Sequence, residues 1–133
     1  MNFTEAVKTC FSKYATFSGR AARPEYWWWI LFTFIVYTAT FAIDANFIAP
    51  MLGLSAFGED GSQPLSTLVS LILLLPGIAV GVRRLHDIDR SGWWMLIVLI
   101  PVIGVLVLIY WAVQRGTDGE NRFGAGGERD AVL

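Results

Sequence analysis

The sequence predicts an all-α integral membrane protein, and its composition and its long uncharged runs both point to that fold class. Hydrophobic residues make up 55% of the 133-residue chain and charged residues only 16%, whereas soluble domains average about 25% charged residues. The mean hydropathy is +0.54, and three long runs, 26–43, 65–82 and 93–113, carry no charge. We therefore expect one membrane domain at 1–124 and a flexible tail at 125–133.

Charge and rare residues narrow the possible functions. The net charge of -1 gives no electrostatic reason to expect a nucleic-acid partner. Cys10 is the only cysteine and His86 the only histidine. A disulfide within the chain is therefore impossible, and a conventional zinc site would lack ligands. We expect no metal and no cofactor.

The first stretch, 2–15, has the spacing of an amphipathic helix. Apolar Phe3, Ala6, Cys10 and Tyr14 recur on one face, with charged and polar residues between them. The helix would either pack on the rest of the protein or lie in the headgroup layer. Charged residues are spread over the next ten positions, so we expect no cleavable secretory signal and a retained first span.

We expect three spans, at about 26–46, 65–84 and 93–113. The 18 uncharged residues of 26–43 cover about 27 Å as a helix, close to a hydrocarbon core of roughly 30 Å. Pro76 and Pro101 interrupt the later spans, where each would make a packing kink or a re-entrant segment. The glycines and prolines of 49–64 predict a loop. The expected interfacial anchors are aromatic: Trp27, Trp28, Trp93 and Trp94.

The distribution of lysine and arginine predicts the orientation. With three spans, the N-terminal arm and the 83–92 stretch share one side and carry seven such residues. The tail carries three and 49–64 carries none. The positive-inside rule then places the N-terminus in the cytoplasm. A re-entrant segment at Pro76 or Pro101 would return the tail to that same side.

The 83–92 stretch holds three arginines, two aspartates and the histidine between apolar runs. A charge at the bilayer centre costs about 2.5–3.5 kcal/mol on insertion scales, so this stretch must reach the headgroup layer or water. Charged residues of the arm are expected at the same depth. The candidate site comprises Arg20, Arg23, Glu25, Arg83, Arg84, His86, Asp87 and Arg90.

Three interpretations of this cluster remain open. The arginines and carboxylates would stabilise topology and pair with one another, or they would bind an anionic lipid phosphate or solute. A catalytic interpretation would use His86 as acid or base with Asp87 or Asp89. The opening of a calcium loop at 87–92 lacks its final glutamate, because Val98 stands there. We expect no catalytic residue and no enzymatic activity.

Three motifs carry a resemblance to a known family. They are FSGRAARPEYW at 17–27, RRLHD with SGWW at 83–94, and GTDGENRFG at 116–124. In this order they resemble domain-of-unknown-function family 805, which comprises small bacterial inner-membrane proteins. The resemblance implies a multi-pass protein of the bacterial inner (plasma) membrane. It also implies that the tail around Asn121 and Arg122 is ordered, and these two residues join the candidate site.

The sequence thus favours a binding or accessory module of the membrane. Its interfacial cluster would contact anionic lipid headgroups or a partner protein, and the chain would work alone or as a homo-oligomer. One alternative is a component of a small transporter or channel, because proline-broken spans occur in transporters. The other is an enzyme that acts on lipid headgroups.

Overall fold

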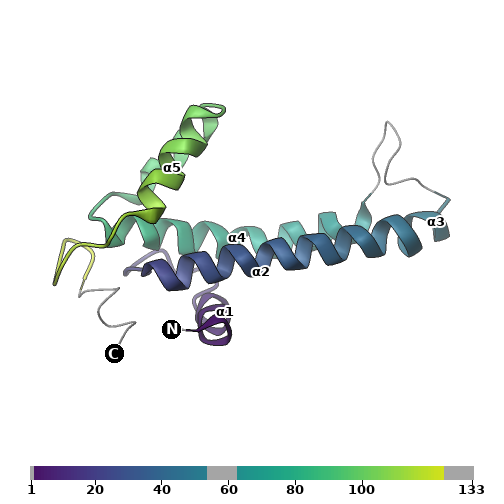
Figure 1. Ribbon diagram of the computed structural model, residues 1–133, viewed down its shortest axis with the longest axis horizontal. Helices are drawn as coiled ribbons and strands as arrows, with labels where there is room; N and C mark the ends of the chain where they lie inside the picture. Colours follow the sequence, from purple (N-terminus) through teal and green to yellow (C-terminus); the bar gives the residue numbers. More distant parts are fainter. Residues whose placement is uncertain (1, 54–62, 125–133) are drawn as a thin grey trace. The chain divides into compact units, whose positions relative to one another are not determined.

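A computed structural model describes residues 2–53 and 63–124 (Figure 1). Part of the loop expected at 49–64, and the whole tail expected at 125–133, lie outside these residues. The expected all-helical class is confirmed, because the described residues contain helices and one isolated bridge between Asn121 and Gly124. The elements are α1 Phe3–Ser12, α2 Arg23–Ile43, η1 Asp44–Ile48, α3 Ala49–Met51, α4 Pro64–Asp87, η2 Gly92–Leu99 and α5 Ile103–Val113.

The chain divides into two compact units, and one of them is Ile30–Leu75. It contains most of α2, the π-helical turn η1, the short α3 and the first half of α4. Asp44 is fully buried, and its carboxylate accepts hydrogen bonds from the backbone N–H groups of Leu65 (2.9 Å) and Ser66 (2.7 Å). The charge that ends the first uncharged run therefore caps the start of α4, which has Pro64 at its first position.

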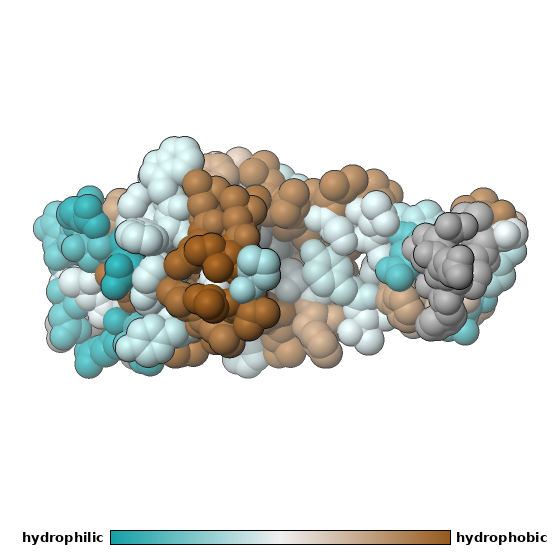
Figure 2. Space-filling view, turned by 90° about the horizontal axis from the view of Figure 1, so that it is seen from above, coloured by the Kyte–Doolittle hydropathy of each residue, from teal (hydrophilic) through white to brown (hydrophobic). Residues whose placement is uncertain are grey.

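Within the described residues, two helical stretches are long and apolar enough to cross a membrane, Arg23–Met51 and Pro64–Asp87. Their surfaces are apolar: Phe34 is 68% exposed and Leu71 is 65% exposed. Figure 2 shows apolar residues over much of the visible face of the helices. Exposed apolar surface of this extent is expected where lipid is the solvent. The expected interruption at Pro76 does not end a helix, since α4 runs through it.

The other unit is Met1–Trp29 with Pro76–Leu133, and α1 packs within it. The side chain of Asn2 caps α1 by accepting from the N–H of Glu5 at 2.9 Å. Ala6 and Cys10 are fully buried, and the Phe11 ring meets Trp29 edge to face at 5.3 Å between centroids. The helix thus packs on the protein, and its predicted place in the headgroup layer stays a prediction.

The structure differs from the expected third span at 93–113. The residues form the 3₁₀-helix η2, a turn at Pro101 and the 11-residue α5, which at 1.5 Å per residue covers about 16 Å. The chain doubles back: the Trp94 and Trp111 rings lie 5.6 Å apart, and a Cβ on Gly104 would be 1.8 Å from the carbonyl oxygen of Ile97. Pro101 lacks an N–H to continue the helix, and Gly104 permits the close approach.

This helical hairpin determines where the segment after it lies. From here on, "the tail" means residues 116–124. Both of its ends meet the C-terminal end of α4, because Arg90 lies over the Trp111 ring at 4.3 Å and the N–H of Thr117 donates to the carbonyl of Asp87 at 2.7 Å. The chain therefore returns to the end of α4 after the turn at Pro101, as the re-entrant alternative requires, and its path through the membrane stays a prediction. Residues 116–124 pack on the charged cluster.

Candidate functional site

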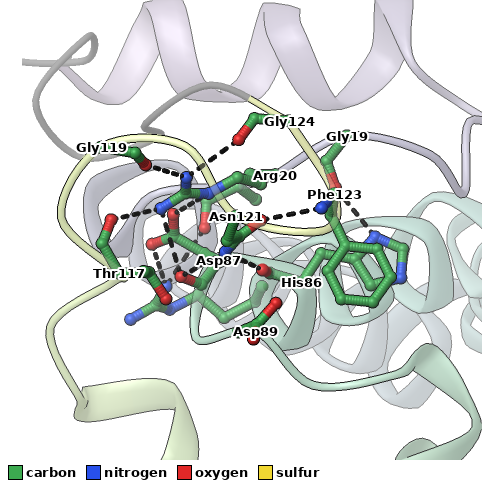
Figure 3. A network of polar contacts seen from close by, with 12 residues as sticks. Gly19, Arg20, His86, Asp87, Asp89, Thr117, Gly119, Asn121, Phe123 and Gly124 are labelled. Atoms are coloured by element: carbon green, nitrogen blue, oxygen red, sulfur yellow. Dashed lines mark hydrogen bonds and ion pairs between the residues drawn. The ribbon is translucent and has the colours of Figure 1, made fainter.

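Asp87, the last residue of α4, is the centre of a buried ionic network (Figure 3). Its Oδ1 accepts from Nε of Arg20 at 2.9 Å, and its Oδ2 accepts from Nη1 of Arg84 at 2.5 Å. The side chains of all three residues are at most 2% exposed. One carboxylate therefore neutralises part of the charge of two guanidinium groups, and further acceptors must satisfy the remaining donors.

Backbone carbonyl groups of the tail supply those acceptors for Arg20. Its Nη1 donates to Gly119 at 2.6 Å and Gly124 at 3.2 Å, and its Nη2 donates to Thr117 at 2.6 Å. Figure 3 shows these bonds converging on the guanidinium from the loop of the tail. Arg20 thus fixes the tail against the end of α4 through the backbone, with no requirement for particular side chains.

Arg84 donates in the same way to backbone carbonyl groups at the end of the helical hairpin. Its Nε donates to the carbonyl of Ala112 at 3.1 Å, and its Nη2 donates to that of Gln114. Nη1 also reaches the carbonyl of Ala21 at 3.2 Å. These carbonyls belong to the end of α5 and to the arm, so a single guanidinium joins three segments. Terminal carbonyls of a helix need such partners, because they have none within the helix.

Arg83 points to a different partner, Glu25, in the first turn of α2. Its Nη1 donates to the Glu25 carboxylate, and its side chain is fully buried. Nε and Nη2 make no hydrogen bond to the described residues. The Cys10 thiol lies close enough to Arg83 and Glu25 to be affected by their charges. Burial raises the pKa of this thiol to about 12, so it is neutral at physiological pH.

His86 contacts the arm with its side chain and the tail with its ring face and its backbone. Its Nδ1 lies 2.8 Å from the carbonyl oxygen of Gly19, and its ring stacks on Phe123 with 3.9 Å between centroids and an angle of 1°. Its own carbonyl accepts from Nδ2 of Asn121 at 2.9 Å. The imidazole is therefore held on both its edge and its face.

Asp89 and Arg122 form the outer contact between α4 and the tail. Nε of Arg122 donates to Oδ1 of Asp89 at 3.1 Å, and Nη2 donates to its carbonyl at 2.7 Å. The hydrogen bond from Arg122 lowers the pKa of the Asp89 carboxyl below its usual 3.8. Asp89 has a φ of 61°, a left-handed conformation that aspartate and asparagine adopt more readily than most residues.

The structure brings most of the predicted site residues together, in two groups. Arg20, Arg84, His86, Asp87 and Asn121 share one network, whereas Arg83 and Glu25 form a separate buried pair. The remaining candidates lie at the edge of this region: Arg23 is half-buried at the start of α2, Arg90 lies on Trp111, and Arg122 is exposed.

The predicted aromatic anchors have different environments. Nε1 of Trp27 donates to the carbonyl of Ala112 at 3.2 Å, and Trp28 meets Phe3 edge to face at 5.8 Å. Trp93 is 79% exposed and Trp94 is 48% exposed, as expected of rings at the membrane surface. Three of the four anchors thus also tie helices together, since Trp94 of η2 meets Trp111 of α5 edge to face.

Sequence reasoning missed the residues that complete the network. They are the carbonyls of Thr117, Gly119 and Gly124, the Phe123 ring and Gly116, where a Cβ would lie 2.1 Å from Oδ2 of Asp87. The glycine-rich composition of 116–124 was the available indication, since glycine marks close backbone approach. In the part of the chain that the structure describes, no group of three His, Cys, Asp or Glu residues is placed to hold a metal ion.

Comparison with known proteins gives a consistent picture. The family model described as "Protein of unknown function (DUF805)" matches residues 14–125. The inner membrane protein YhaH of Escherichia coli K12 is 46% identical over 111 residues, which are 84% of this chain and 86% of YhaH. Inner membrane protein YhaI of the same strain is 43% identical, over 84% of this chain and 85% of YhaI. No solved structure matches the chain.

Proposed function

This chain belongs to the DUF805 family and is a multi-pass protein of the bacterial inner membrane, and on that basis we propose that it is a binding module for anionic lipid headgroups. The observation that carries the proposal is the distribution of charge. No lysine or arginine occurs in 24–82 or 91–114, so all ten lie in the remaining segments. Anionic lipids attract such a concentration of basic residues by about 1 kcal/mol per residue at the membrane surface.

In this proposal the buried arginines stabilise the fold and do not bind the lipid themselves. Arg20 and Arg84 donate to Asp87 and to backbone carbonyls, which leaves little capacity for a phosphate. Their network instead holds the arm, the end of α4 and the tail together. A preorganised basic surface binds with a smaller loss of conformational freedom than separate mobile segments would.

The lipid contacts are assigned to accessible cations around that network, which we call the basic rim. Arg115 and Arg122 have side chains that are 62% and 64% exposed, and Lys8 is exposed on α1. The full set of the basic rim is Lys8, Lys13, Arg90, Arg115 and Arg122. Long side chains of this kind reach headgroups while their stems lie on apolar surface.

Native mass spectrometry of the purified protein in detergent tests this function. We expect phosphatidylglycerol to bind more tightly than phosphatidylethanolamine, with an affinity that falls as salt is added. The double variant Lys8→Gln/Arg115→Gln should bind phosphatidylglycerol about thirtyfold more weakly, which corresponds to about 2 kcal/mol. Ser12→Gln, an uncharged change on an exposed position of α1, is the matched control. Equal affinity of the double variant and the control would overturn the proposal.

A further inference from the structure

A cavity of about 450 Å³ lies beside His86, separate from the basic rim. Its lining residues are Phe17, Val82, His86, Ser91, Gly92 and Trp93. The volume is within the range of about 300–1,000 Å³ that small-molecule sites have. Among the described residues that line it, none carries a formal charge at neutral pH when His86 is neutral. Such a lining favours a neutral ligand, because it offers no partner for a charge.

The imidazole of His86 gives this cavity a fixed hydrogen-bond acceptor. The Gly19 carbonyl, 2.8 Å from Nδ1, can only accept, so in the neutral ring the proton is on Nδ1 and Nε2 carries a lone pair. Nε2 makes no hydrogen bond to the described part of the chain. In Figure 3 it points away from the polar network, and the Phe123 ring holds the imidazole plane.

The cavity wall is held in place by tight packing. A Cβ on Gly92 would be 2.6 Å from Cγ1 of Val82, so the start of η2 lies directly against α4. The hydroxyl oxygen of Ser91 caps η2 by accepting from the N–H of Trp93, and the hydroxyl donates to none of the described residues. Trp93 and Phe17, two of the lining residues, are 79% and 42% exposed, and such rings are suited to the membrane surface.

We propose that this cavity binds a neutral amphiphile from the membrane whose polar end is a hydroxyl group. The hydroxyl donates to Nε2 of His86, and the apolar body lies against Val82, Phe17 and Trp93. The two sources of this chemistry are an alcohol, as in a diacylglycerol, and a phenol, as in a hydroquinone. The proposal is independent of the anionic-lipid function, because it uses no residue of the basic rim.

The single histidine makes the test direct. Protein labelled with ¹⁵N-histidine gives one pair of imidazole resonances, and a donor that reaches Nε2 shifts its resonance. Four ligands are titrated in detergent: dioctanoylglycerol, trioctanoylglycerol, a short-chain hydroquinone and its dimethyl ether. We expect a saturable shift of Nε2 with a hydroxyl ligand and none with its hydroxyl-free counterpart. The alcohol and phenol arms decide between the two sources.

Two results would overturn the proposal: no saturable shift with any ligand, or equal shifts with and without the hydroxyl. In a separate binding assay, His86→Phe should weaken the preferred ligand about tenfold, because one neutral hydrogen bond is lost. If this variant fails to fold, Val82→Leu narrows the cavity and keeps His86 as reporter, and an unchanged titration would count equally against the site. Lys8→Gln/Arg115→Gln should bind this ligand normally, whatever its effect on phosphatidylglycerol.

Discussion

Gly116 lies directly against Asp87, so closely that a Cβ at position 116 would be 2.1 Å from Oδ2 and 2.5 Å from Cγ of the carboxylate. The carboxylate is not free to move away, because Arg20 and Arg84 hold its two oxygens. The absence of a side chain at Gly116 is therefore a condition for the tail to dock on the end of α4.

Gly116→Ala should displace the tail from the network. The added methyl group overpacks a buried site, for which about 1–3 kcal/mol of destabilisation is typical. Thermal unfolding in detergent measures this loss, and trypsin cleavage at the exposed Arg122 should accelerate. The neighbouring Thr117→Ala is the control, because Thr117 contributes its backbone N–H and carbonyl to the network. Equal stability of the two variants would contradict the assigned packing.

Asp87→Ala should be among the most destabilising substitutions in the chain. It leaves the buried Arg20 and Arg84 without their shared carboxylate, and breaking a buried ion pair typically destabilises by about 3–5 kcal/mol. Arg115→Ala removes an ion pair with Asp118 in which both side chains are more than 60% exposed, and should change stability by about 1 kcal/mol or less. Denaturant unfolding of each variant measures its loss of free energy of unfolding, and the loss should be larger for Asp87→Ala than for Arg115→Ala.

The contact between Asp89 and Arg122 should depend on pH. The hydrogen bond lowers the Asp89 pKa below 3.8 in the folded protein, so the ionised form is the one that folding favours. Its contribution is complete above the unfolded pKa and is lost as pH falls through the lower, folded pKa. The Arg122 Nε–H resonance should therefore shift between pH 5 and about 2. The same titration of Asp89→Asn should be flat, and a matching shift there would exclude the assignment.

The membrane topology should have an even number of crossings. Since the hairpin at 92–113 returns the chain to the end of α4, we expect the N-terminus and residue 124 in the cytoplasm and 54–62 on the opposite side. Fluorescent-protein and alkaline-phosphatase fusions at these three positions check the arrangement. Opposite compartments for the N-terminus and residue 124 would restore three full crossings.

The first two spans were predictable because the length and composition of a long uncharged run indicate a membrane-spanning helix without any detail of packing. The third run satisfied the same criterion of length and composition. What turned it into a hairpin is the contact between Gly104 and the backbone of Ile97, a tertiary relationship that periodicity does not record. Pro101 marked the position of the turn, and the choice between a kink and a reversal depended on that packing.

The candidate site was predictable to a similar extent. Depth in the membrane correctly grouped Arg20, Arg84 and Asp87, because charged side chains are excluded from the hydrocarbon. Their hydrogen-bond partners were not predictable. Every residue has a backbone carbonyl group. The sequence therefore does not indicate that a guanidinium will bind those of Thr117 and Gly119. The exposed arginines and the buried ones therefore looked alike before the structure was known.

The partners of Arg20 lie between 67 and 104 residues further along the chain. At a ribosomal rate of about 5–20 residues per second, the last of them is synthesised roughly 5–20 seconds after Arg20 itself. Until then the guanidinium must stay hydrated, because burial without acceptors is prohibitive. The arm that carries Arg20 is thus synthesised before the segments that bind it, and it reaches its final place only after they have formed.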